Sequence, residues 1–314
     1  MTDRAAAMTL NVGTRASTLA LAQTDAAMAL FRERHAEFAA PGRLARIEIS
    51  TTGDQVLDRP LADIGGKGLF SKEIDRAMLD GRIDFAVHSM KDLETWMPAG
   101  IVIAAVLPRE DPRDMLIAAA GGIDDLLQGS RIGTSSVRRQ AQLLHRRPDL
   151  VCVPFRGNVG TRLKKLDAGE ADATILACAG LNRLGQKIPG ATPIPTDVML
   201  PACAQGAVAI TCRENDETTR ALLAALNDPA TDTRVTAERA VLEALDGSCR
   251  TPIGGLAEVQ GGRLRLQGLV AGLDGKKVCR GAREGGASDA RAMGLDLGAE
   301  LKALAGPDIF AAGG

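Results

Sequence analysis

Arginine and hydroxyl side chains gather where predicted strands give way to predicted helices. Residues 13–17 (GTRAS) place a guanidinium and a hydroxyl at one such point, and residues 133–139 (GTSSVRR) place three hydroxyls and two guanidiniums at another. The first turn of a helix presents unpaired N–H groups and the positive end of the helix dipole, so it suits anions. These segments indicate anion sites, although simple capping by serine or threonine explains the hydroxyls equally well.

Further arginines follow later predicted strands. Residues 155–162 (FRGNVGTR) offer a strand end, a glycine-bearing loop with two arginines and a helix start, and Arg183 follows the next predicted strand. Genomic bias is one of two explanations for the 29 arginines among the 38 basic residues, and selection for anion binding is the other. Bias does not place them at the carboxyl ends of strands, where open α/β sheets bind ligands. Guanidiniums match carboxylates bidentately, so a polycarboxylate ligand is predicted. Arg138 and Arg139 point to different sides of a helix, which leaves one of them open to a purely solvated role.

A lysine–aspartate pair ends another predicted strand, residues 83–87, in the sequence HSMKD. Lys91 and Asp92 would set an anion binder beside an acid or proton acceptor, and a surface ion pair is the alternative. The nearby GGKGLF (residues 65–70) fails the phosphate-loop pattern, because no serine or threonine follows its lysine. It is better explained as a mobile loop that caps a site, with Lys67 reaching in.

One of the six cysteines differs from the others in its surroundings. The others mostly lie in apolar runs, whereas Cys249 lies in a Gly/Ser/Pro loop beside Arg250. An exposed loop with a neighbouring cation favours the thiolate. No histidine is near it in sequence, so a Cys–His protease site has little support. Cys249 is a candidate reactive thiol.

The elements that would position these residues form two similar halves. A predicted strand (8–12) leads to a helix (18–31), and later a strand ending at 130–132 leads to a helix (137–146). Two βα lobes with parallel-rich sheets are the simplest account. Residues 108–112 are predicted to cross to the second lobe and 189–201 to cross back; a strand over 206–212 could complete either sheet.

The pattern changes in the last third of the chain. Two predicted helices (217–226 and 233–245) precede three short strands and a final helix. The strands cover 255–260, 263–271 and 277–283, with Gly-Gly and Asp-Gly hairpin turns between them, and the helix covers 288–304. This predicts an α+β domain with a three-stranded antiparallel sheet.

Composition excludes several classes of protein. The net charge is −1 and aromatics make up 2% with no tyrosine, which disfavours a nucleic-acid module. No run of about 18 apolar residues spans a membrane and no secretory signal is evident. Three scattered histidines and six cysteines without metal-type spacing predict no metal site. A cytoplasmic monomer with reduced thiols is expected.

Taken together, the motifs resemble the porphobilinogen deaminase (hydroxymethylbilane synthase) family from residue 12 to about residue 304. They are GGKGLF, HSMKD, GTSSVRRQ, RGNVGTRL, AGLNRLG, QGAVAI and the CxxPIG turn at Cys249. The resemblance implies two similar doubly wound lobes, periplasmic-binding-protein-like, plus the C-terminal α+β domain. It implies domain 1 at 1–107 and 203–225, domain 2 at 108–202 and a cofactor-carrying domain 3 at 226–314, with the strand at 206–212 in domain 1.

The resemblance also implies an activity. Four porphobilinogen molecules would be joined into hydroxymethylbilane with release of four ammonia, on a dipyrromethane cofactor held by a thioether to Cys249. Uroporphyrinogen-III synthase would take the product. Asp92 would be the catalytic carboxylate. The implied cofactor-binding residues are Lys91, Ser135, Arg138, Arg139, Arg156 and Gly180. The implied substrate-binding residues are Arg15, Ser17, Gln23, Lys67, Arg156, Arg162 and Arg183.

The chain departs from the family pattern at four positions, none of which removes a charged site residue. Ser248 and Ala204 stand where glycine is usual, Glu94 stands where proline is often seen, and Arg250 follows the cysteine. Two other functions compete with the deaminase. A two-lobed solute-binding protein is disfavoured by the missing export signal, the third domain and Cys249, and a phosphate-handling transferase is disfavoured by the failed phosphate loop.

Overall fold

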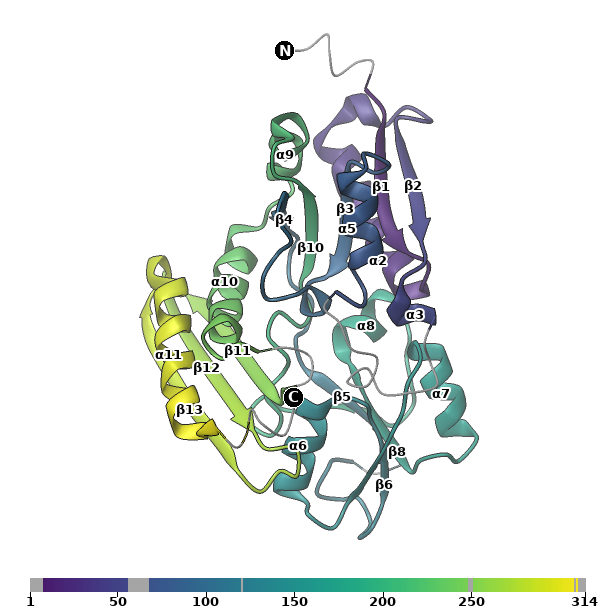
Figure 1. Cartoon of the computed structure of the whole chain (residues 1–314). Coiled ribbons are helices and arrows are strands. Elements are labelled where there is room, and N and C mark those ends of the chain that lie inside the picture. Colours follow the sequence, from purple (N-terminus) through teal and green to yellow (C-terminus); the bar gives the residue numbers. More distant parts are fainter. Residues whose placement is uncertain (1–7, 56–67, 120, 248–250, 308, 310–314) are drawn as a thin grey trace. The chain divides into compact units, whose positions relative to one another are not determined.

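The computed structural model describes residues 8–55, 68–119, 121–247, 251–307 and 309 (Figure 1). The chain divides into two compact units. Unit 1 comprises Met1–Val56, Gly66–Arg109 and Ala207–Asp232. Unit 2 comprises Leu57–Gly65, Glu110–Gly206 and Thr233–Gly314.

Unit 1 is built on a five-stranded sheet in the order β2-β1-β3-β10-β4. Its strands are β1 (Leu10–Arg15), β2 (Leu44–Ile49), β3 (Phe85–Ser89), β4 (Ile101–Val106) and β10 (Val208–Arg213). The first three strands in the order run parallel, and β10 runs antiparallel to both β3 and β4. The strand whose sheet the pattern left open therefore completes the first sheet.

Helices cover both faces of this sheet, because its strands are apolar on both sides. Leu10, Phe85 and Ile210 pack with α2 and α9 on one face, while Ile83 and Ala86 pack with α5 on the other. The helical elements of unit 1 are α2 (Thr18–Arg34), η1 (Ala36–Phe38), α3 (Thr52–Gln55), α5 (Lys72–Leu79), η2 (Met90–Asp92) and α9 (Glu217–Ala224), with the start of α10 (Pro229–Ala244).

The first sheet of unit 2 repeats this plan. Its order is β7-β6-β8-β5-β9, with three parallel strands followed by antiparallel pairings of β5 with β8 and β9. Its strands are β5 (Asp114–Ala118), β6 (Arg131–Gly133), β7 (Val151–Val153), β8 (Ala173–Ala177) and β9 (Ala191–Pro193), and its helices are α6 (Val137–Arg146), α7 (Val159–Asp167) and α8 (Cys178–Arg183). The predicted pair of similar doubly wound lobes is confirmed, although each sheet is mixed rather than mainly parallel.

Helix starts follow the predicted capping in both lobes. The Ser17 hydroxyl accepts from the Ala20 N–H at the start of α2, and the Ser136 hydroxyl accepts from the Arg139 N–H at the start of α6. Each cap satisfies a donor that the first turn cannot pair internally. These caps fix the positions of the residues in the GTRAS and GTSSVRR segments.

The C-terminal part of unit 2 contains the predicted antiparallel sheet. Its strands are β11 (Ile253–Gln260), β12 (Arg263–Ala271) and β13 (Val278–Gly286), followed by η3 (Ala287–Asp289) and α11 (Ala290–Ala305). Leu264 and Leu266 of β12 pack with α10 and α11 on one face. Gly261, Gly262 and Gly275 have positive φ, as the predicted hairpin turns require.

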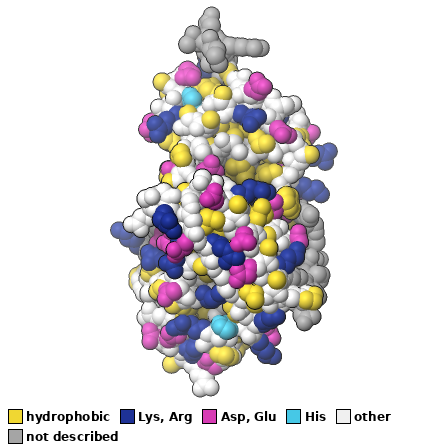
Figure 2. Space-filling model, turned by 90° about the vertical axis from the view of Figure 1, so that its left-hand side faces the viewer, with side chains coloured by type: hydrophobic (Ala, Val, Ile, Leu, Met, Phe, Trp, Pro, Cys, Tyr) yellow, Lys and Arg dark blue, Asp and Glu magenta, His cyan; other side chains and the backbone are white. Residues whose placement is uncertain are grey.

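A membrane span requires a long apolar helix, and a basic surface requires clustered cationic side chains. Among the described residues, no helix is both long and apolar enough to span a bilayer. On the face drawn in Figure 2, basic and acidic side chains are interspersed instead of forming one basic stretch.

Candidate active site

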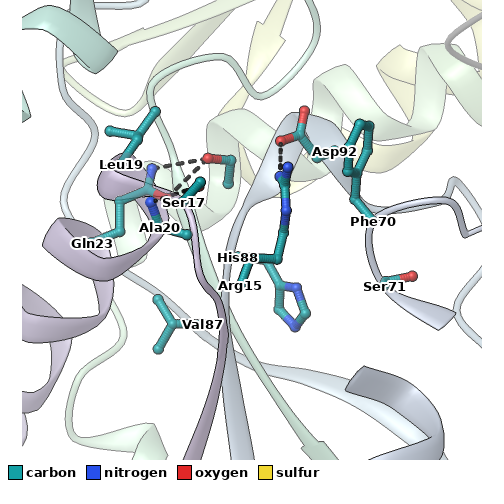
Figure 3. A pocket seen from close by; sticks show the side chains of 11 residues that line it. Arg15, Ser17, Leu19, Ala20, Gln23, Phe70, Ser71, Val87, His88 and Asp92 are labelled. Atoms are coloured by element: carbon teal, nitrogen blue, oxygen red, sulfur yellow. Dashed lines mark hydrogen bonds and ion pairs between the residues drawn. The ribbon is translucent and has the colours of Figure 1, made fainter. Parts of the chain in front are cut away.

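A small pocket in unit 1 collects several of the predicted site residues. Arg15, Ser17, Gln23 and Asp92 line it, together with side chains that the sequence motifs did not assign to a role (Figure 3). Those side chains include Phe70, Ser71, His88 and Ser89. The pocket has a volume of about 60 Å³, room for one carboxylate-sized group and not for a chain of rings.

Arg15 is the cation of this pocket. It ends β1, where its guanidinium pairs closely with Asp54 and lies 3.7 Å from an Asp92 oxygen. The Phe70 ring covers it, with 4.2 Å between the guanidinium carbon and the ring centroid, a cation–π contact. Burial alone would lower the pKa of Arg15, but the Asp54 hydrogen bond and both carboxylate charges raise it overall. The guanidinium is thus permanently charged and held from two sides.

Asp92 lies where strand β3 gives way to the 3-10 turn η2. Its side chain remains 34% exposed and faces Arg15 (Figure 3). Lys91, its neighbour in the motif, is exposed on the same turn. The strand end therefore presents a carboxylate to the pocket.

Two buried polar groups brace this strand end. Gln23 of α2 lies 2.9 Å from the Ser89 hydroxyl through its amide nitrogen, so its amide is bonded to β3. The His88 ring lies 3.0 Å from the Thr211 hydroxyl of β10. Burial, and secondly the charge of Arg15, lower the pKa of His88 to about 4. His88 is neutral at physiological pH and adds no charge to the pocket.

In unit 2, Arg138 and Arg139 share one buried carboxylate. Nη1 of Arg138 lies 2.8 Å from Asp114, and Arg139 donates to Asp114 from Nε at 3.1 Å and Nη2 at 2.7 Å. Backbone oxygens of Leu200 and Ile175 take further N–H groups. The alternative that one arginine is merely solvated is wrong: both lie on the buried side of α6, because a fully buried carboxylate requires cations beside it.

This pairing governs the charge state of the cluster. Burial alone would raise the pKa of Asp114, but the charges of Arg138 and Arg139 hold it well below its usual range. Burial lowers the pKa of Arg139 despite the attraction of Asp114. The cluster of two guanidiniums and one carboxylate therefore carries a net positive charge.

The other predicted residues of unit 2 follow the next two strands. The Ser135 hydroxyl accepts from the Phe155 N–H, which ties the loop before α6 to the RGNVGTR segment. Arg156 is half-buried in that segment, and Nε of Arg162 donates to the Gly157 carbonyl. Gly180 lies buried in α8, a short helix that separates β8 from Arg183. Thus Arg183 ends a helix and does not follow its strand directly.

Arg183 has an unusual setting for a cation. Its Nη2 donates to the Gly206 carbonyl at 2.7 Å. Burial lowers its pKa, and the charge of Glu110 opposes that change. A guanidinium has five N–H donors, and among the described residues this one has a single acceptor, the Gly206 carbonyl.

Cys249 and Lys67 lie outside the described residues. Among the described cysteines, burial raises the pKa of Cys152 and Cys212 to about 11 and that of Cys178 to about 12. Thiols with such raised pKa values stay protonated near neutral pH and form little of the reactive thiolate. No cluster of three or more potential metal ligands occurs among the described residues.

Sequence reasoning missed three polar or aromatic partners: Asp54, Phe70 and Asp114. Asp54 and Asp114 bind arginines that are distant in sequence, and only the sheet and loop packing brings them together. One signal was available, since Asp114 opens an otherwise apolar strand, and a buried acid of that kind requires a partner.

Comparison with known proteins identifies the family. Residues 10–221 match the family model "Porphobilinogen deaminase, dipyromethane cofactor binding domain", and residues 233–303 match "Porphobilinogen deaminase, C-terminal domain". The chain belongs to the porphobilinogen deaminase family. It is therefore an enzyme of the transferase class, and its fold agrees with the family resemblance of its motifs.

Curated porphobilinogen deaminases resemble the chain over nearly its whole length. The protein of Paracoccus denitrificans (strain Pd 1222) is 52% identical over 302 residues, covering 96% of each chain. That of Nitrobacter winogradskyi is 49% identical and covers 95% of this chain and 94% of its own. The chloroplastic porphobilinogen deaminase of Oryza sativa subsp. japonica is 48% identical and covers 96% of this chain and 85% of its own.

The described residues fit the cofactor named by the family model. Dipyrromethane carries carboxylates and pyrrole N–H groups, so it requires guanidinium donors and a carboxylate acceptor. Within the part of the chain that the structure describes, the buried Nε of Arg138 has no hydrogen-bond partner, and a carboxylate that reached it would satisfy a donor that is otherwise costly to leave unpaired. Asp92 supplies the partly exposed carboxylate that pyrrole N–H groups need.

Proposed function

We propose that the chain joins four porphobilinogen molecules head to tail into hydroxymethylbilane, with release of four ammonia, on a dipyrromethane primer bound to Cys249. The observation that carries this proposal is the pairing of Arg15 with a partly exposed Asp92 in one pocket. A fixed cation and a partly exposed carboxylate suit a substrate that has both carboxylates and N–H donors.

Asp92 is the catalytic carboxylate of the proposal. Departure of ammonia leaves positive charge on the reacting ring, and a carboxylate positioned beforehand stabilises that charge as it develops. Arg15 holds the carboxylate in place from one side. Neutral His88 behind the pocket avoids a second cation that would oppose the developing charge.

The arginines and their hydroxyl neighbours are the proposed carboxylate binders. Each added ring brings two more carboxylates, and only donors that stay charged at every working pH can balance them. The proposed cofactor contacts are Lys91, Ser135, Arg138, Arg139, Arg156 and Gly180, and the proposed substrate contacts are Arg15, Ser17, Gln23, Lys67, Arg156, Arg162 and Arg183. Gln23 has its amide bonded to Ser89, so we expect it to act mainly by positioning β3.

The cofactor, when bound, supplies a tethered pyrrole acceptor, which makes each addition effectively intramolecular. Cys249 holds it by a thioether. Among the described cysteines, the raised pKa values of Cys152, Cys178 and Cys212 make these thiols unsuited to that role. Cys249 is thus a permanent anchor and not a nucleophile in turnover.

Three further features complete the proposal. Domain 1 would comprise 1–107 and 203–225, domain 2 would comprise 108–202 and domain 3 would comprise 226–314. Each sheet of unit 2 has a main apolar core of its own, which supports the last division, and a smaller cluster around Leu200 and Leu256 joins the two. The enzyme would act as a cytoplasmic monomer. Its unstable linear product would pass to uroporphyrinogen-III synthase.

Intact mass under denaturing conditions tests the central claim. The wild-type protein should carry a covalent excess equal to two linked pyrrole units, and Cys249→Ser should lack it. Cys279→Ser is the matched control, because Cys279 is a partly buried cysteine of β13. It should keep the adduct. An active wild-type protein without any covalent excess would disprove the proposal.

A further inference from the structure

Gln205 occupies a central place where the chain leaves unit 2. It is 1% exposed and immediately precedes Gly206, the last residue before the chain re-enters unit 1. Its amide nitrogen donates to the Pro112 carbonyl at 2.8 Å and lies 3.0 Å from an Asp114 oxygen. Residues 112–114 belong to the other passage of the chain, just after it enters unit 2. One side chain therefore joins the incoming and outgoing segments.

The carboxylate that Gln205 contacts is the shared counter-ion of Arg138 and Arg139. The same Asp114 oxygen, Oδ1, accepts from Gln205 and from Nε and Nη2 of Arg139, and the other oxygen accepts from Arg138. The amide is the neutral donor in this set. The Gln205 amide fixes the rotation of the Asp114 carboxylate. The carboxylate in turn fixes the plane of the Arg139 guanidinium, whose Nε and Nη2 form a fork around Oδ1.

A third arginine meets the same short segment. The Gly206 carbonyl accepts from Nη2 of Arg183 and, at 3.1 Å, from the Glu110 backbone N–H. Ala204, which precedes Gln205, donates its backbone N–H to the buried Glu238 carboxylate. The segment is therefore anchored at Ala204, contacts Arg183 directly through Gly206, and reaches Arg138 and Arg139 through Asp114.

We propose that Gln205 is a positioning residue for carboxylate binding. It does not touch substrate; it sets the geometry of Asp114 and of the adjoining Gly206 carbonyl, and so aligns Arg138, Arg139 and Arg183. This inference rests on the proposed function, in which these arginines bind the carboxylates of cofactor and substrate. A purely structural role for Gln205 is the competing explanation.

Gln142 provides a matched control for that competing explanation. It is also a buried glutamine, 3% exposed, and its amide bonds both the N–H and the carbonyl of Leu200. Its third hydrogen bond goes to the Arg138 carbonyl, so its amide bonds backbone groups and not the Asp114 carboxylate. Gln205→Leu and Gln142→Leu each remove backbone hydrogen bonds from the interior of unit 2, but only the first removes a donor from the carboxylate.

The test compares the two variants as full-length holoenzyme. Gln205→Leu should raise KM for porphobilinogen about tenfold while kcat stays within about threefold, because misaligned binders weaken capture more than chemistry. Intact mass should also show a smaller fraction of protein carrying the covalent cofactor. Gln142→Leu should lower the thermal midpoint by a similar amount, with KM and cofactor fraction near wild type.

A second substitution covers the case in which Gln205→Leu fails to fold. Gln205→Glu keeps the shape but replaces the donor with an anion beside Asp114, which competes for Arg138 and Arg139. Its KM should rise further than that of the leucine variant. Wild-type KM in Gln205→Glu, or an equal rise in Gln142→Leu, would overturn the inference.

A crystal structure of Gln205→Glu separates this inference from the proposed function. The inference requires the Arg139–Asp114 fork to be displaced in that variant and retained in Gln142→Leu. A retained fork in both would refute it even if the wild-type enzyme is a working deaminase. A wild-type protein without a covalent adduct or turnover would refute the proposed function, while a displaced fork would still support the positioning role.

Discussion

The loops that follow β1 and β6 have nearly the same sequence plan but hold their arginines differently. Both run from Gly-Thr to a capping serine and a helix. In the first lobe, Arg15 lies at the strand end and faces a pocket lined by Asp92. In the second lobe, Arg138 and Arg139 belong to the first turn of helix α6, and their side chains are buried.

The position of the counter-ion accounts for this difference. In the first sheet, Ser89 at the end of β3 pairs with Val208; in the second, Ala177 at the end of β8 pairs with Asp114. The third residue beyond these strand ends is Asp92 in one lobe and Gly180 in the other. The carboxylate thus sits on an exposed turn in the first lobe and on a buried strand in the second.

One sequence plan thus serves two purposes. A carboxylate on a partly exposed turn can meet a substrate and take part in chemistry. A carboxylate buried under two guanidiniums cannot meet a substrate, but it fixes the guanidiniums above it. We infer that the first lobe supplies reactivity and the second supplies rigid binding.

Removing the exposed carboxylate should have the largest effect. For Asp92→Ala we expect turnover to fall about 10³-fold, because a charge aligned with the reacting ring is lost from the pocket. The covalent cofactor should remain, as judged by intact mass. Steady-state assays of product formation give the rate.

Asp54→Asn is the control for this prediction. Asp54 is the other partner of Arg15 but does not line the pocket. Its loss should raise KM more than it lowers kcat. Equal losses of kcat in the two variants would mean that Asp92 acts only by holding Arg15, which would remove the proposed contrast between the lobes.

Removing the buried carboxylate should instead act on stability. For Asp114→Asn we expect the free energy of unfolding to fall by about 3 kcal/mol or more, because two buried guanidiniums lose their common anion. Urea unfolding followed by circular dichroism measures it. Asp111→Asn, at a more exposed pair with Arg113, should lose less than about 1 kcal/mol. Similar losses for both would show that the buried cluster is not a stabilising element.

The contrast between these carboxylates marks the limit of what the sequence could predict. Helix α6 begins and ends at the predicted residues, because its serine cap and apolar spacing are local signals. The meeting of the GTRAS and HSMKD motifs was also predictable, since strand ends of one sheet meet at one edge. The Asp114 pairing was not, because it depends on β5 lying beside β8, a pairing of strands about sixty residues apart.

Asp75 shows the opposite titration behaviour to Asp114. It lies on α5 of the first lobe and is buried, and its Oδ1 has no hydrogen-bond partner among the described residues. Burial, with added repulsion from Glu73 and Glu94, raises its pKa to about 6, although a Ser71 hydrogen bond opposes the change. The folded state therefore favours the protonated form, and this stability is present below about pH 4 and lost as the pH rises through about 6.

Asp75→Asn should abolish the loss of folding stability that accompanies ionisation of Asp75 at higher pH. The variant should be more stable than wild type by about 2 kcal/mol at pH 8, and the difference should vanish near pH 4. Urea unfolding at both pH values measures it. Asp80→Asn changes an exposed acid at the other end of the same helix and controls for the loss of one negative charge. A variant less stable than wild type at pH 8 would mean that an unidentified cation partners Asp75.

The smallest expected effect concerns the turn that supports Gln205. Ala204 has φ of 60°, the left-handed region that favours glycine. For Ala204→Gly, relief of about 1–2 kcal/mol of backbone strain offsets the lost buried methyl, about 0.8 kcal/mol, and the freer unfolded chain, about 0.5–1 kcal/mol. We expect a free energy of unfolding within about 1 kcal/mol of wild type.

Ala207→Gly tests whether that balance is real. Ala207 is also buried but does not have positive φ, so its replacement gives no relief and should lose about 1.5 kcal/mol. Equal losses in the two variants would show that Ala204 is not strained, and that Glu238 alone determines the conformation of the turn. If Ala204→Gly keeps both the free energy of unfolding and the KM of the wild type, backbone strain at residue 204 does not position the arginines of the second lobe. Side-chain contacts such as those of Gln205 would then hold them.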